Sequence, residues 1–155
     1  MNKSYQILLL GIVILALDQG SKYLFLQGFT WSCPYFSLHL VFNEGVAFSM
    51  LSSLGSSLKY AQLALLLALS LFFLRQKSMH AYKIELCVLL ISGASNILDR
   101  FIHGAVIDFF AWHWGFRFAV FNLADTFINL AVFSIILKEF ISWLRKKNQK
   151  KETHA

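Results

Sequence analysis

Apolar residues in this chain fall into four long runs separated by polar segments. The runs cover about residues 5–26, 58–74, 84–102 and 122–144. Each approaches the roughly 20 residues that an α-helix needs to cross a bilayer. The pattern predicts an all-α integral membrane protein with four transmembrane helices, in which residues 1–155 form a single membrane domain.

The two segments 27–57 and 103–121 have a different composition from the apolar runs that flank them. Residues 35–42 alternate and are rich in β-formers, which predicts short strands lying at the membrane surface. Asn43 and Gly45 follow as a turn signal. The aromatic cluster 111–118 favours the water interface. Together these segments are expected to form a small extracytoplasmic β-cradle and loop region.

Basic residues indicate the orientation of the four spans. They lie at Lys3, in the segment 75–83 and in the tail 145–151. Positively charged segments tend to remain in the cytoplasm, so both termini and the 75–83 loop are expected there. The net charge of +6 therefore reflects topology. Nucleic-acid binding is not expected, because the basic residues flank apolar runs instead of forming one face with stacking aromatics.

The first apolar run also has the length of a secretory signal peptide. Asp18 and Lys22 interrupt it, however, and no clear small-x-small cleavage site follows. It is interpreted as an uncleaved transmembrane helix. The two charged residues are four positions apart, so they share a helical face and can pair near its outer end.

All four aspartates, Asp18, Asp99, Asp108 and Asp125, fall at or near the outer interface in this topology. Simple helix termination would also place polar residues there. Ionisable residues in a bilayer are costly, however, and their clustering favours a functional site. Two carboxylates from different segments can share one proton and act as acid and base toward a water molecule. Asp125 follows Asn122 at a helix start, which favours its ionised form, so a carboxylate in the preceding loop is the expected proton holder.

Other chemistries are less well represented in the sequence. The histidines are scattered and no His-Glu-x-x-His motif occurs, so no metal site is expected. No Gly-x-Ser-x-Gly turn indicates a serine nucleophile, and no glycine-rich phosphate loop indicates a nucleotide. No cofactor is expected.

Five blocks in order along nearly the whole chain resemble the bacterial lipoprotein signal peptidase (type II signal peptidase) family. They are Asp18-Gln19 with Lys22, residues 43–48 beginning Asn43-Glu44-Gly45, residues 93–100 ending in Asn96, Asp99 and Arg100, residues 104–109 containing Asp108, and residues 121–125 containing Asn122 and Asp125. Glu44, Val46 and Ser95 are small departures from the family pattern that leave the aspartates intact.

The resemblance implies an aspartic endopeptidase of the bacterial cell inner membrane, multi-pass, with its site toward the extracytoplasmic side. It would cleave prolipoproteins before a diacylglyceryl-modified cysteine, with Asp108 and Asp125 as the catalytic pair. Asp99 and Arg100 would support the pair, and Asp18 with Lys22 would hold the first helix to it. Asn43, Asn96 and Asn122 would line or brace the site, and Gly45 would let the backbone approach the substrate peptide. Lipid-modified prolipoproteins and membrane lipids are the expected partners, and the protein is expected to be a monomer.

Two other functions are compatible with the composition. A small transporter or channel subunit would use intramembrane carboxylates as a proton relay, but a relay distributes its acids through membrane depth. A structural membrane subunit without chemistry would leave the motif-rich stretches unexplained.

Overall fold

The computed structural model describes residues 2–45, 55, 57–116 and 118–152. The part of the expected asparagine–glycine block that covers residues 46–48 lies outside this range.

Four long helices make up most of the protein: α1 (Lys3–Leu26), α2 (Ser57–Arg75), α3 (Lys83–His103) and α4 (Leu123–Glu152). A short 3-10 helix, η3 (Lys77–Tyr82), joins α2 to α3. All four long helices are apolar and long enough to cross a membrane. Their outward positions carry large exposed apolar side chains such as Leu65, Phe72 and Phe133. The prediction of four transmembrane helices is therefore confirmed.

Small residues let the helices approach one another at α3. A side chain added at Gly93 of α3 would come within 3.2 Å of Leu66 on α2. One added at Gly11 of α1 would come within 3.3 Å of Ile91 on α3. Close approach at small residues is a usual device of helix packing in lipid, where no hydrophobic force acts between helices.

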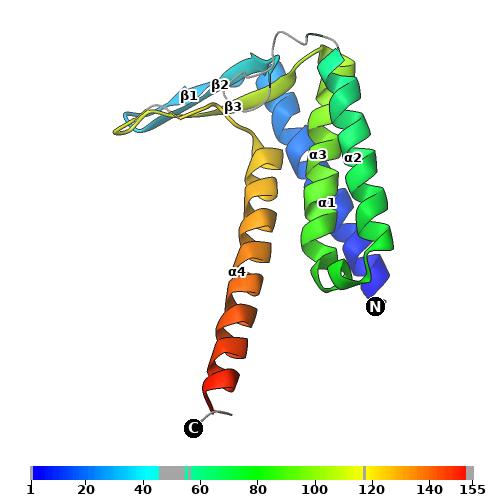
Figure 1. The fold of residues 1–155 in the computed structure, drawn as a ribbon. Helices are drawn as coiled ribbons and strands as arrows, with labels where there is room; N and C mark the ends of the chain where they lie inside the picture. The colour runs from blue at the N-terminus through cyan, green and yellow to red at the C-terminus, as the bar shows by residue number, and fades with distance from the viewer. Residues whose placement is uncertain (1, 46–54, 56, 117, 153–155) are drawn as a thin grey trace.

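A three-stranded antiparallel sheet lies across one end of the helices, and both termini lie at the other end (Figure 1). Its strands are β1 (Trp31–Ser32), β2 (Phe36–Asn43) and β3 (Val106–Trp112), in the order β1-β2-β3. The register places Val41 of β2 opposite Asp108 of β3. The expected β-cradle is thus present.

Two elements differ in extent from the sequence expectations. The strand β3 occupies part of the segment 103–121 that was expected as loop. Its first half, Val-Ile-Asp-Phe, is buried on both faces, so the sequence does not show the alternation of apolar and polar residues that indicates a strand. Helix α4 continues past the expected end at 144 to Glu152. The basic tail contains good helix formers without glycine or proline, so no local signal ends the helix there.

Candidate active site

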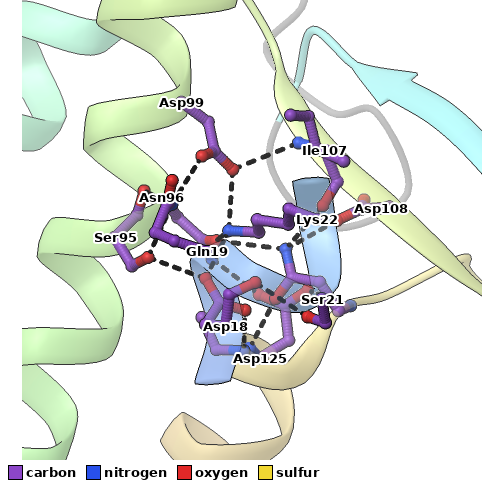
Figure 2. Close-up of polar contacts among 12 residues, drawn as sticks. Asp18, Gln19, Ser21, Lys22, Ser95, Asn96, Asp99, Ile107, Asp108 and Asp125 are labelled. Atoms are coloured by element: carbon purple, nitrogen blue, oxygen red, sulfur yellow. Dashed lines mark hydrogen bonds and ion pairs between the residues drawn. The ribbon is translucent and has the colours of Figure 1, made fainter. Parts of the chain in front are cut away.

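The residues singled out in the sequence meet where the sheet joins the helices. Asp18 and Lys22 come from α1, and Asn96, Asp99 and Arg100 come from α3. Asp108 lies on β3, and Asn43 ends β2, two residues before Gly45. Asn122 directly precedes α4, and Asp125 lies in its first turn. Figure 2 shows the polar contacts that connect α1, α3, β3 and α4.

A buried cation holds two buried carboxylates at the centre of this region. Lys22 Nζ lies 2.6 Å from Asp18 Oδ2 and 2.7 Å from Asp99 Oδ2. The exposed fractions of the three residues are 1%, 0% and 0%. Ser95 Oγ also donates to Asp18 at 2.7 Å, and Gln19 Nε2 donates to Asp99 at 2.8 Å. Buried charges persist only when they are paired and hydrogen-bonded, and each of these is.

The same two carboxylates anchor the backbone of the segments that carry Asp108 and Asp125. Asp18 Oδ1 accepts a hydrogen bond from Ala124 N at 2.8 Å, at the first turn of α4. Asp99 Oδ2 accepts one from Ile107 N at 3.3 Å, one residue before Asp108. The ion cluster therefore determines where both site aspartates lie.

The orientation of the Asn96 amide follows from Lys22. An ammonium group can only donate, and Lys22 Nζ donates to Asn96 Oδ1 at 2.9 Å. The nitrogen of the amide must then face the other way, where it donates to Asp125 Oδ1 at 2.9 Å. Lys22 thereby aims a hydrogen-bond donor at Asp125.

Asn122 and Asp125 cap helix α4 reciprocally. Asn122 Oδ1 accepts from Asp125 N at 2.9 Å, and Asp125 Oδ2 accepts from Asn122 N at 3.2 Å. This arrangement is a capping box, which satisfies amide groups that a helix start leaves without partners. The side-chain nitrogen of Asn122 remains free for other acceptors and donates to Asp108 Oδ1 at 2.9 Å.

Asn43 holds the second oxygen of Asp108. Its Oδ1 accepts from Gly45 N at 3.1 Å, and its Nδ2 donates to Asp108 Oδ2 at 2.9 Å. Arg100 donates to the carbonyl oxygens of Glu44 and Gly45 and so keeps this turn in place. The turn after β2 is thus built to direct one donor at Asp108.

Asp108 is a buried residue, with an exposed fraction of 1%. Burial raises its pKa from 3.8 to about 7, and the charge of Asp125 adds to this. The hydrogen bonds from Asn43 and Asn122 and the charge of Lys22 oppose the rise in pKa. A carboxyl whose pKa lies near neutrality can hold a proton and release it at physiological pH.

A cavity of about 360 Å³ opens beside both aspartates. Its polar lining consists of Asn43, Gly45, Gln62, Asn96, Arg100, Asp108, Asp125 and Asn129, and its apolar lining of Val106, Phe118, Ala119, Phe121 and Ile128. The structure therefore brings six of the ten predicted residues to the cavity, while Asp18, Lys22, Asp99 and Asn122 are not among the residues that line it.

Four polar residues near the site were not among the ten predicted site residues, although Gln19 and Ser95 lie in the motif blocks. Gln62 and Asn129 line the cavity from α2 and α4, and Gln19 and Ser95 bond the buried carboxylates. A polar residue inside an apolar run was the available signal for Gln62. For Ser95, the signal was its helical spacing of four from Asp99.

Two histidines of the outer segment, His103 and His113, are both exposed and do not line the cavity. The ring of His113 lies 3.2 Å from the carbonyl oxygen of Cys33 in the sheet region.

The fold is similar to that of two solved bacterial membrane enzymes. One gives a TM-score of 0.77 with 23% identity, covering 91% of each chain. The other gives 0.72 with 23% identity, covering 86% of this chain and 91% of that one. At this identity the likeness concerns the fold alone.

Several proteins named lipoprotein signal peptidase are similar to this chain in sequence. The one from Helicobacter acinonychis is 43% identical over 139 residues, covering 89% of this chain and 88% of that protein. The one from Wolinella succinogenes is 46% identical over 130 residues, covering 83% and 89%. The one from Campylobacter jejuni serotype O:23/36 is 44% identical over 140 residues, covering 90% and 89%.

The family described as Signal peptidase (SPase) II matches residues 10–141, a range that contains all ten predicted site residues. The chain therefore belongs to the signal peptidase II family and is a membrane protease.

Proposed function

We propose that the protein removes signal peptides from prolipoproteins, cleaving before the diacylglyceryl-modified cysteine with Asp108 and Asp125 as a catalytic dyad. One observation carries the proposal. Among the described residues that line the 360 Å³ cavity, Asp108 and Asp125 are the carboxyl groups, and no serine, threonine, cysteine or histidine is among them. This lining supports a hydrolysis in which the two carboxyl groups activate a water molecule.

Asp125 acts as the base in this mechanism and Asp108 as the acid. Asp125 lies in the first turn of α4, where the helix dipole favours a carboxylate, and it takes a proton from the attacking water. Asp108 holds the shared proton and gives it to the scissile carbonyl oxygen as the water oxygen adds to the carbon. In the second half, Asp125 passes its proton to the leaving nitrogen, the carbon–nitrogen bond breaks, and Asp108 recovers a proton from the hydroxyl.

The asparagines position the dyad for this exchange. Asn43 and Asn122 each donate to one oxygen of Asp108, and Asn96 donates to Asp125. Both carboxyl groups also line the cavity, where the water and the peptide would lie. Asp99, Arg100 and the Asp18–Lys22 pair act through these residues and through the backbone that they hold.

The substrate enters from the membrane. A signal peptide is an apolar helix, so it can diffuse laterally to the cavity, whose walls include transmembrane helices α2, α3 and α4. Gln62 supplies an amide that hydrogen-bonds a peptide group of this substrate, and Gly45 allows the backbone to come close.

The protein acts as a monomer in the bacterial inner membrane, with its active site on the extracytoplasmic side. The basic segments support this orientation, because they lie at the end of the molecule away from the sheet (Figure 1).

A carboxylate proton relay of a transporter is disfavoured by the placement of the aspartates. All four lie where the sheet meets the helices, whereas a relay requires acids along the membrane depth.

Cleavage of a diacylglyceryl-modified prolipoprotein peptide in detergent tests the proposal. Wild type is expected to cleave before the modified cysteine, and Asp108→Asn and Asp125→Asn to lose about 100-fold or more in kcat. Glu44→Gln is the matched control, since Glu44 is an exposed carboxylate outside the cavity lining. Near-normal turnover by either folded aspartate variant would show that the dyad is wrongly assigned. Loss of wild-type activity with a chelator would indicate a metal-dependent reaction.

A further inference from the structure

A second cavity, of about 550 Å³, lies at the end of the molecule opposite the active site. It is bounded by the start of α1, by η3 with the start of α3, and by α4. The lining residues are Gln6, Ile7, Leu10, His80, Ala81, Lys83, Ile84, Glu85 and Lys138. Because α3 begins at Lys83, this cavity lies near the membrane surface, at the depth of lipid headgroups.

Glu85 contributes an unusual acceptor to the wall of this cavity. The residue is 7% exposed, and its Oε1 accepts from Ser134 Oγ at 2.9 Å and pairs with Lys138. Its Oε2 is buried and has no hydrogen-bond partner among the described residues. A buried carboxylate oxygen without a donor is unfavourable, so a ligand that supplies one would bind here. Glu85 is one of the residues that line the cavity, so a ligand bound there lies next to this carboxyl group.

Other lining residues add a polar group and an apolar group to this cavity. Lys83 and His80 are exposed residues of the lining, and an ammonium group with an imidazole N–H offers donors that favour an anion. Ile7, Leu10 and Ile84 form an apolar wall that continues along the helices. A matching ligand would carry a cation with N–H donors, an anion and a hydrocarbon chain.

We propose that this cavity binds a phospholipid whose headgroup carries a primary ammonium group. The ammonium donates to Glu85 Oε2, the phosphodiester lies against Lys83 and His80, and an acyl chain packs on Ile7, Leu10 and Ile84. The lipid would stabilise the contact of α1 and α3 with α4 at this end. This site is separate from the dyad, and its existence does not depend on the proposed function.

The proposal distinguishes two lipids that have the same net charge. Phosphatidylethanolamine has an ammonium with three N–H donors, whereas the quaternary ammonium of phosphatidylcholine has none. Binding of the two, with identical acyl chains, is measured on the full-length protein in detergent by thermal unfolding and by native mass spectrometry. We expect phosphatidylethanolamine to bind about tenfold more tightly, as one charge-assisted hydrogen bond would give.

Glu85→Gln should reduce this preference to less than about twofold, because an amide offers a weaker acceptor than a carboxylate. Glu139→Gln is the control: Glu139 lies on α4 outside the cavity lining and bonds Tyr82, and this variant should keep the preference. The native mass spectrometry of wild type needs no variant, so the test stands even if Glu85→Gln does not fold. Equal binding of the two lipids by wild type would overturn the proposal. So would a preference that survives in folded Glu85→Gln, or tighter binding of phosphatidylglycerol, which would indicate only a basic surface.

Discussion

Asn122 donates a hydrogen bond to Asp108 at 2.9 Å, although the two residues belong to different elements. The same side chain caps α4 through its oxygen, which accepts from Asp125 N at 2.9 Å. One amide thus stabilises the start of a transmembrane helix and bonds the acid of the proposed dyad.

These two contributions of Asn122 can be separated by substitution. Asn122→Ser keeps an oxygen that can cap the helix but removes the donor to Asp108, so kcat should fall about tenfold with little change in unfolding free energy. Asn122→Ala loses the cap as well and should unfold about 1 kcal/mol more easily. Unfolding in detergent and steady-state cleavage measure the two effects. Equal stability of both variants would mean that the cap contributes nothing.

The activity should decline on the alkaline side with an apparent pKa near 7, because burial raises the pKa of Asp108 to about 7 and the mechanism needs its proton. The Asn43 hydrogen bond lowers this pKa. Asn43→Ala should therefore raise the pKa further and move the alkaline limb of kcat/KM to higher pH. Asn129→Ala, on the same cavity but outside the bonds to Asp108, should leave the limb in place. A limb that moves to lower pH in Asn43→Ala would contradict the assignment.

Stability should depend on pH through the same group. The folded-state pKa of Asp108 is raised above its ordinary value of 3.8, so the folded protein binds this proton more tightly than the unfolded chain does. The contribution to stability is complete below 3.8 and is lost as the pH rises through about 7. Asp108→Asn cannot titrate and should show a shallower decline in unfolding free energy over this range. An unchanged slope would show that Asp108 is not the group responsible.

Replacing Lys22 should destabilise the protein more than replacing either of its partners. Lys22→Met leaves Asp18 and Asp99 buried without their cation, which costs about 3–5 kcal/mol, and it frees the Asn96 amide to turn away from Asp125. Asp99→Asn keeps the Asp18–Lys22 pair and should cost less, while lowering activity through the Ile107 contact. Adding Asp99→Asn to Lys22→Met should recover part of the lost stability, because one unpaired charge is removed. Additive losses in the double variant would argue against a shared ion cluster.

Gln62 should affect substrate affinity and not stability. Its Oε1 is buried without a partner among the described residues, so Gln62→Met should leave the unfolding free energy unchanged or raise it. The KM for the lipid-modified peptide should rise about fivefold to tenfold if Gln62 hydrogen-bonds the substrate. Gln76→Met, beyond the other end of α2, is the matched control and should leave KM unchanged. An unaltered KM in Gln62→Met would remove this residue from the substrate site.

The sequence alone predicted the four spans, the presence of a small sheet and ten candidate site residues. Hydropathy and charge act locally along a chain, so run lengths and basic segments were sufficient for the spans. The i, i+4 spacing of Asp18 and Lys22 likewise predicted a pair that the structure shows at 2.6 Å. The five motif blocks carried the resemblance, and the family comparison supports it.

Tertiary structure decided which atoms of these residues meet. The pairing of β2 with β3 places Asp108 opposite Val41, and no local signal in β3 predicted it because a strand buried on both faces does not alternate. That Lys22 aims the Asn96 amide at Asp125, or that Gln62 faces the cavity, depends on how the helices are rotated about their axes. Spacing specifies the face that a residue shares with its neighbours, but only packing against the other elements determines what that face contacts.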